Sequence, residues 1–174
     1  SYMPEALAIK AGTDILFSEF LQTGLIYIQT ASSMIPAKVL GPDAGDHVLD
    51  MCAAPGSKTT HIAALMGNRG SIDAWDVYPH KVKLIKDNAK RLGISIIHTE
   101  VRDSVKPLPF LYETYDKVLL DAPCSGLGVL GHKVELRWRR KESDLSVFPP
   151  LQKQLIEQAA KYTKTGGVLV YSTC

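Results

Sequence analysis

The chain has 174 residues, a formal net charge of +2 at pH 7 and a hydrophobic content of 45%. This length suits one domain with one sizeable core, and the small net charge means that any sign of a nucleic-acid partner must come from local clusters. No apolar run approaches the roughly 20 residues of a membrane span, and no secretory signal peptide is recognisable, so we expect neither membrane insertion nor secretion.

The N-terminal portion predicts short elements without chemistry of their own. We expect a helix at residues 14–21, a strand at 25–29, where the sequence is apolar and β-branched, and a helix at 31–40. A Gly/Pro cluster at 41–45 then indicates a turn. We interpret residues 1–46 as a lead-in that packs onto the following domain.

Strands and helices alternate from His47 onward. The predicted strands are residues 48–51, 71–76, 94–101, 115–120 and 168–171, and the predicted helices are 59–66, 80–92 and 151–162. This alternation predicts an α/β fold with a doubly wound, mainly parallel sheet in residues 47–174. Because the sequence stops just after the fifth strand, we expect the native sheet to continue beyond it, so the domain is expected to be truncated there.

The stretch Asp50-Met-Cys-Ala-Ala-Pro-Gly-Ser-Lys-Thr59 joins the first of these strands to a helix. Its small residues would let a ligand approach the backbone, and the helix would offer unpaired N–H groups to a carboxylate or phosphate. It is not a P-loop, because Cys52 and Ser57 stand where that motif has glycines, and the dinucleotide Gly-x-Gly-x-x-Gly pattern is absent. The stretch therefore predicts a small-molecule site, and the missing glycines argue against a nucleoside triphosphate as its ligand.

Acidic residues follow the next two strands. Asp76 ends the second strand, where a carboxylate accepts hydrogen bonds from both hydroxyls of a ribose, and Asp73 is a weaker rival for that role. Asp103 follows the third strand and would accept from an adenine amino group. Capping the following helix is the alternative for Asp76, and a cap or turn is the alternative for Asp103.

The three cysteines are Cys52, Cys124 and Cys174. They form no Cys-x-x-Cys pair and are odd in number, which argues against a disulfide scaffold and favours a reducing, cytoplasmic location with free thiols. A lone cysteine is usually buried and inert. Two of these cysteines, however, lie at predicted strand ends, in Asp121-Ala-Pro-Cys-Ser-Gly126 and Tyr171-Ser-Thr-Cys174.

Together, these two motifs and the Asp50–Thr59 stretch resemble the Sun/Nop-type RNA cytosine-5 methyltransferases, which are Rossmann-like class I enzymes dependent on S-adenosylmethionine. The resemblance implies transfer of a methyl group to carbon 5 of a cytosine in rRNA or tRNA through a covalent cysteine adduct. It implies Cys174 as nucleophile and Cys124 in product release. It also implies Lys58 and a protonated or hydrogen-bonded Asp121 as the groups that stabilise negative charge on the base. The residues implied in binding S-adenosylmethionine are Cys52, Ala53, Ala54, Pro55, Gly56, Ser57, Lys58, Asp76, Asp103 and Asp121.

Partner predictions rest partly on charge. His132-Lys133 and Arg137-Trp-Arg-Arg-Lys141 form a basic run in which Trp138 would stack on a base or on the core, with a solvated loop as the alternative. The lysines of residues 81–91 and Arg91 read as an exposed helix surface. We expect an RNA partner, no metal and a monomer. A non-catalytic module that binds S-adenosylmethionine or RNA is the alternative to an enzyme.

Overall fold

The computed structural model describes residues 6–9, 14–126, 138 and 144–173. Its centre is a five-stranded sheet made of β1 (His47–Asp50), β2 (Ser71–Asp76), β3 (Ile97–Val101), β4 (Tyr115–Asp121) and β5 (Thr163–Ser172). The strand order is β3-β2-β1-β4-β5, and every pair is parallel. The predicted doubly wound parallel sheet is therefore confirmed, with its topological switch point between β1 and β4.

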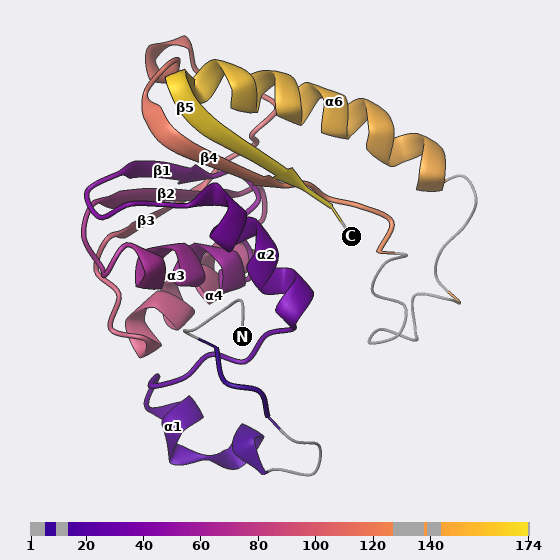
Figure 1. Cartoon of the computed structure of the whole chain (residues 1–174). Coiled ribbons are helices and arrows are strands. Elements are labelled where there is room, and N and C mark those ends of the chain that lie inside the picture. The colour runs from indigo at the N-terminus through magenta and orange to yellow at the C-terminus, as the bar shows by residue number, and fades with distance from the viewer. Residues whose placement is uncertain (1–5, 10–13, 127–137, 139–143, 174) are drawn as a thin grey trace.

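Helices cover both faces of the sheet (Figure 1). α6 (Asp144–Tyr162) covers one face, whereas α2 (Ala31–Leu40), α3 (Ser57–Leu65) and α4 (Pro79–Arg91) cover the other. The shorter elements are the 3-10 turns η1 (Ile15–Phe17) and η2 (Pro109–Leu111) and the helix α1 (Glu19–Gln22). None of the helices in the described ranges is both long enough and apolar enough to cross a bilayer.

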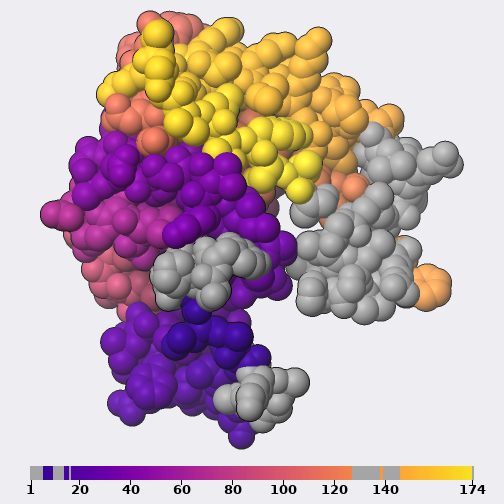
Figure 2. Space-filling view, in the orientation of Figure 1, coloured from indigo at the N-terminus to yellow at the C-terminus, as the bar shows by residue number. Residues whose placement is uncertain are grey.

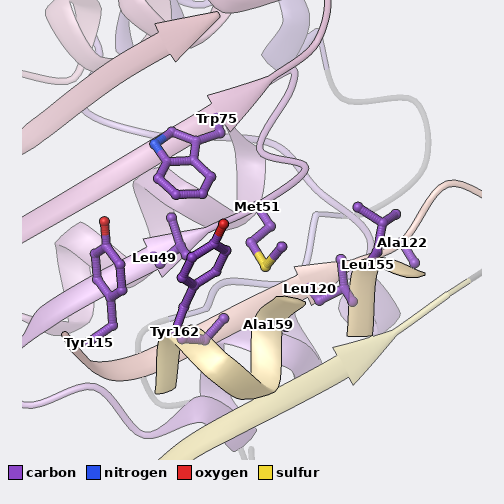
Figure 3. Close-up of a cluster of buried hydrophobic side chains, with 10 residues drawn as sticks. Leu49, Met51, Trp75, Tyr115, Leu120, Ala122, Leu155, Ala159 and Tyr162 are labelled. Atoms are coloured by element: carbon purple, nitrogen blue, oxygen red, sulfur yellow. The ribbon is translucent and has the colours of Figure 1, made fainter. Parts of the chain in front are cut away.

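The core lies in two layers because strand side chains alternate between the faces. Leu49 of β1 and Leu120 of β4 point toward α6 and pack with Leu155 and Tyr162 (Figure 3). Their neighbours along each strand, including Val48, pack against α2 and α3 on the opposite face. Trp75 and Tyr115 are buried in the first layer, and their rings meet edge to face. Burial on both faces explains why the central strands are continuously apolar.

The N-terminal portion differs from its predicted elements. The helix expected at 14–21 is split into η1 and α1, because Ser18 adopts an extended conformation and caps α1 by accepting from the Leu21 N–H. The strand expected at 25–29 is wrong: those residues belong to no strand, and the Ile26 carbonyl accepts instead from the Arg91 side chain. An apolar, β-branched run forms a strand only where a neighbouring strand supplies hydrogen bonds.

Figure 2 shows the N-terminal segment as a lobe that projects from the body of the molecule. Later elements match their predictions apart from their ends: β2 has the predicted bounds, β3 starts three residues later than expected, and α6 starts at Asp144. β3 begins late because the turn after α4 extends to Ile94, whose N–H donates to the Ala89 carbonyl.

Candidate active site

The loop between β1 and α3 lies at the carboxyl end of the central strand. Its path is fixed by backbone hydrogen bonds from Ala53 N–H to the Trp75 carbonyl, at 2.8 Å, and from Gly56 N–H to the Ala53 carbonyl, at 2.7 Å. Gly56 has a φ of 103°, a conformation that side chains other than glycine rarely adopt. α3 then begins at Ser57, so the unpaired N–H groups of its first turn face the end of the sheet.

An ion pair joins the first turn of α3 to the end of β4, and a hydrogen bond extends this contact to β5. Lys58 Nζ lies 2.7 Å from Asp121 Oδ2 at the end of β4. Ser172, at the end of β5, donates its hydroxyl to Asp121 Oδ1 at 2.7 Å. The structure thus brings together the predicted pair Lys58 and Asp121, and it adds Ser172. The motif that contains Ser172 was recognised, but a strand-end hydroxyl gives no signal of its own in a sequence.

Asp50 lies directly beneath the loop and is 1% exposed. Its Oδ2 accepts from the Thr59 hydroxyl at 2.7 Å. No donor among the described residues reaches Oδ1 with hydrogen-bond geometry. Burial raises the pKa of Asp50 to about 7, with a further increase from Asp121 and opposing contributions from Thr59, Lys58 and the Cys52 N–H. Asp50 is therefore a buried carboxyl group poised to change charge near neutral pH.

Cys52 is half-buried beside these acids and is a free thiol. Burial raises its pKa, and the negative charges of Asp50, Asp76 and Asp121 raise it further, while Lys81 opposes them. Cys52 therefore stays protonated at neutral pH and is a poor nucleophile. The same three carboxylates make this end of the sheet a favourable place for a cation.

Asp76 ends β2 and is 8% exposed. Its Oδ1 accepts from the Tyr78 N–H at 3.0 Å, which forms a local turn. The alternative predicted for Asp76, an N-cap of the following helix, is wrong. The N-cap residue of α4 is Tyr78, whose side chain makes no cap hydrogen bond. Because a carboxylate can accept several hydrogen bonds, Asp76 can still accept from a ligand while it holds this turn.

Asp103 follows β3, and its Oδ1 accepts from the Val105 N–H at 3.2 Å. This contact is the turn that the sequence offered as an alternative to an adenine contact. The next residue, Ser104, is buried and donates to the Met51 carbonyl at 2.7 Å. That bond holds the turn against the end of β1, and it was not predicted, because a serine after an acid carries no distinctive pattern.

Of the two cysteines in the predicted reaction, the structure describes Cys124. Cys124 follows β4, and its sulfur accepts from the Gly126 N–H at 3.3 Å. Its role in product release stays a prediction. Cys174 lies outside the described residues.

The basic run also falls outside the described residues, except for Trp138. Its side chain is 88% exposed, so core packing is excluded for this ring. In the helix surface expected at residues 81–91, Lys83, Lys86 and Lys90 are exposed as predicted. Lys81 and Arg91 are half-buried instead, and Arg91 is hydrogen-bonded to the N-terminal segment.

Within the described ranges, no cluster of three or more His, Cys, Asp or Glu side chains could hold a metal ion. Two cavities of about 610 and 650 Å³ lie away from the carboxyl ends of the strands. The first lies at the amino end of β5 and the second beneath the N-terminal segment. The candidate site is therefore the acidic carboxyl edge of the sheet rather than either of these cavities.

Comparison with known proteins agrees with this geometry. A model of the family described as 16S rRNA methyltransferase RsmB/F matches residues 37–174. The chain belongs to this family. The match includes the β1–α3 loop, the acids at the strand ends and the three cysteines.

Relatives of this family are similar along nearly the whole chain. The chain is 44% identical to a probable ribosomal RNA small subunit methyltransferase B of Bacillus subtilis, over 98% of this chain and 38% of that protein. It is 42% identical to the human tRNA (cytosine(72)-C(5))-methyltransferase NSUN6, over 99% of this chain and 38% of that protein. The chain thus spans about two fifths of the length of these relatives.

Solved structures support the fold. The structure of NSun6 from Pyrococcus horikoshii with SFG superposes with a TM-score of 0.83 at 39% identity, over 93% of this chain and 41% of that one. A SAM-dependent O-methyltransferase from Thermotoga maritima superposes with a TM-score of 0.60 at 18% identity, over 83% of this chain and 44% of that one. The second likeness shows the Rossmann-like fold alone.

Proposed function

We propose that this chain is the catalytic part of an S-adenosylmethionine-dependent RNA cytosine-5 methyltransferase. The observation that carries the proposal is the position of Asp50, Asp76 and Asp121, which end β1, β2 and β4 beside the β1–α3 loop. A sulfonium cofactor is a cation, and its amino-acid end carries both an ammonium and a carboxylate. The acids suit its positive groups, and the N–H groups at the start of α3 suit its carboxylate.

Names of relatives support the cofactor and the substrate class. The archaeal NSun6 structure contains SFG, an analogue of S-adenosylmethionine. The relatives are named for ribosomal RNA and for cytosine 72 of tRNA. We therefore propose RNA, either rRNA or tRNA, as the substrate of this chain.

In this proposal, residues 52–58 hold the amino-acid end of the cofactor, Asp76 holds the ribose and Asp103 the adenine side. Asp103 would do so with the acceptor sites that its turn leaves open. When bound, S-adenosylmethionine would supply the methyl group on a positively charged sulfur. The proposal retains residues 47–174 as the methyltransferase domain, residues 1–46 as its lead-in, a monomeric state and a cytoplasmic location.

The chain's own residues would activate the base. Carbon 5 of cytosine is a weak nucleophile, and addition of the Cys174 thiolate at carbon 6 makes it an enamine carbon. Lys58, whose ammonium lies 2.7 Å from Asp121, would donate to the O2/N3 edge of the base as negative charge develops there, and Asp121 would assist in a protonated form. After methylation, loss of the carbon 5 proton expels the Cys174 thiolate, and Cys124 would assist this release.

Calorimetry with S-adenosylmethionine tests the cofactor site. We expect micromolar binding by the wild-type chain and binding about tenfold to a hundredfold weaker in Asp76→Ala, since charge-assisted hydrogen bonds to the ribose are lost. Asp87→Ala is the matched control, because Asp87 is an exposed acid paired with Lys83. A folded wild type that does not bind, or an Asp76→Ala variant that binds equally well, would overturn the proposal. ATP should not raise the melting temperature.

A further inference from the structure

Helix α4 forms the support behind the β1–α3 loop. A Cβ atom added at Gly56 would lie 3.2 Å from the Ile85 Cα, so the loop and the helix backbone are in direct contact. One turn further along α4, Asn88 donates from Nδ2 to the Pro55 carbonyl at 3.0 Å. This is a side-chain bond from α4 to the turn that carries the predicted cofactor-binding residues.

The orientation of the Asn88 amide is fixed by its second partner. Asn88 Oδ1 accepts from Arg91 Nη2 at 3.3 Å. A guanidinium only donates, so the carbonyl oxygen of Asn88 must face Arg91, which leaves the amide nitrogen for Pro55. Arg91 therefore helps to aim the Asn88 side chain at the loop.

Arg91 also holds the N-terminal segment. Its Nη1 donates to the Leu21 carbonyl at 2.7 Å and to the Ile26 carbonyl at 3.4 Å. Its guanidinium lies 5.7 Å from the centre of the Tyr27 ring. Gly24 sits so close to the end of α4 that an added Cβ would lie 1.8 Å from the Arg91 carbonyl oxygen. The segment is thus seated directly on α4.

We propose that Asn88 is a positioning residue for the cofactor loop, and that Arg91 couples this position to the N-terminal segment at residues 21–27. The proposal rests on the proposed function, because it assigns the loop to the cofactor. Hydrogen bonds weaken steeply with poor alignment, so a loop that loses its support presents its N–H groups less well. The N-terminal segment would then influence cofactor affinity without touching the cofactor.

The first test compares Asn88→Asp and Asn88→Ala with Asp87→Ala, an exposed neighbour on the same helix, by calorimetry with S-adenosylmethionine. Asn88→Asp keeps an oxygen facing Arg91 but removes the donor to Pro55. We expect both Asn88 variants to bind about threefold to tenfold more weakly, with the control unchanged. If Asn88 only stabilises the helix through Arg91, Asn88→Asp keeps wild-type affinity and melting temperature, and the proposal is overturned.

Amide hydrogen exchange without ligand separates this proposal from the proposed function. We expect residues 52–58 to exchange faster in both Asn88 variants than in the wild type or Asp87→Ala. A wild type that fails to bind S-adenosylmethionine, but shows this change, refutes the proposed function and keeps the positioning role. Unchanged exchange refutes the positioning role.

A double-mutant cycle tests the coupling. We expect Arg91→Met to weaken binding, and the Asn88→Ala/Arg91→Met double variant to be little weaker than Asn88→Ala alone, because both act through one chain of contacts. Arg91→Lys, which keeps the positive charge, controls for misfolding. Effects of the two single substitutions that simply add would show that Arg91 does not act through Asn88.

Discussion

The two ends of the sheet both carry aspartates, but the groups around these acids differ. At the amino end, Asp73 accepts from the Tyr115 hydroxyl at 2.7 Å and lies 3.3 Å from His47 Nε2. Asp116 accepts from the His47 N–H at 2.9 Å and from Lys164 at 2.6 Å. The Lys164 hydrogen bond is the largest of the effects that lower the pKa of Asp116.

At the carboxyl end, one acid is both buried and incompletely paired. Asp50 has one oxygen that accepts no hydrogen bond of good geometry from the described residues, and burial raises its pKa to about 7. Asp121 has partners on both oxygens, Lys58 and Ser172. The Lys58 side chain is only 17% exposed, so its ion pair is largely shielded from solvent. Because unpaired buried charge is costly, it persists where a ligand uses it. The incompletely paired Asp50, rather than the mere presence of acids, therefore distinguishes the candidate site from the amino end of the sheet.

The largest effect should come from Lys58. Lys58→Met removes the partner of Asp121 and a donor to the base, and we expect RNA methylation to fall by about 100- to 1,000-fold. Lys83→Met is the matched control, because Lys83 also lies 2.7 Å from an aspartate, Asp87, but in an exposed pair. Rates would be compared at saturating cofactor. If methylation falls equally in Lys58→Met and Lys83→Met, the Lys58–Asp121 pair has no special role in the reaction.

Asp50 should give a smaller, pH-dependent effect on stability. Its pKa in the folded state, about 7, exceeds its ordinary value of 3.8, so folding takes up a proton between these pH values. Stability should therefore fall as pH rises through this window and level off above about 7. Asp50→Asn lacks the charge, and we expect it to be more stable than wild type by on the order of 1–3 kcal/mol near pH 8, with no gain near pH 4.

Urea unfolding at both pH values would check this expectation, with exposed Asp87→Asn as the control for a change of charge. The control should show no such pH-dependent gain. An Asp50→Asn variant that is destabilised equally at both pH values would mean that the Asp50 carboxylate is fully satisfied in the folded chain.

The smallest effect should come from the amino end. Tyr115→Phe removes one hydrogen bond to Asp73 while His47 remains, so we expect a loss of about 1 kcal/mol in the free energy of unfolding. Affinity for S-adenosylmethionine should not change. A Tyr115→Phe variant with normal stability but weakened cofactor binding would show that the two ends of the sheet are not separate in function.

The sequence predicts the sheet and the edge at which the site residues gather. Short apolar runs alternating with helical periods predicted the parallel sheet, and a parallel sheet gathers the carboxyl ends of its strands at one edge. That geometry was enough to place Asp76, Asp121 and the β1–α3 loop on one edge. Lys58 and Asp121 were both predicted, but their ion pair follows from the register of β1 and β4, which a single sequence does not specify.

The unpredicted contacts are those between distant side chains. Ser172 with Asp121, and Arg91 with the Leu21 carbonyl, join residues that are 51 and 70 positions apart. Arg91 was read as exposed because its helix has a charged face, and only the packed N-terminal segment reveals its role. The strand predicted at 25–29 failed for the same reason, since the local sequence does not say which neighbour is available.

The most direct test of the account is a covalent adduct with RNA. The reduced chain would be incubated with S-adenosylmethionine and single-stranded RNA containing 5-fluorocytosine, in which the carbon 5 proton that release requires is replaced by fluorine. We predict an adduct that survives a denaturing gel for the wild type and none for Cys174→Ser. No adduct from a wild type that binds both ligands, or an adduct that persists in Cys174→Ser, would contradict the assignment of this chain as a cytosine-5 methyltransferase acting through Cys174.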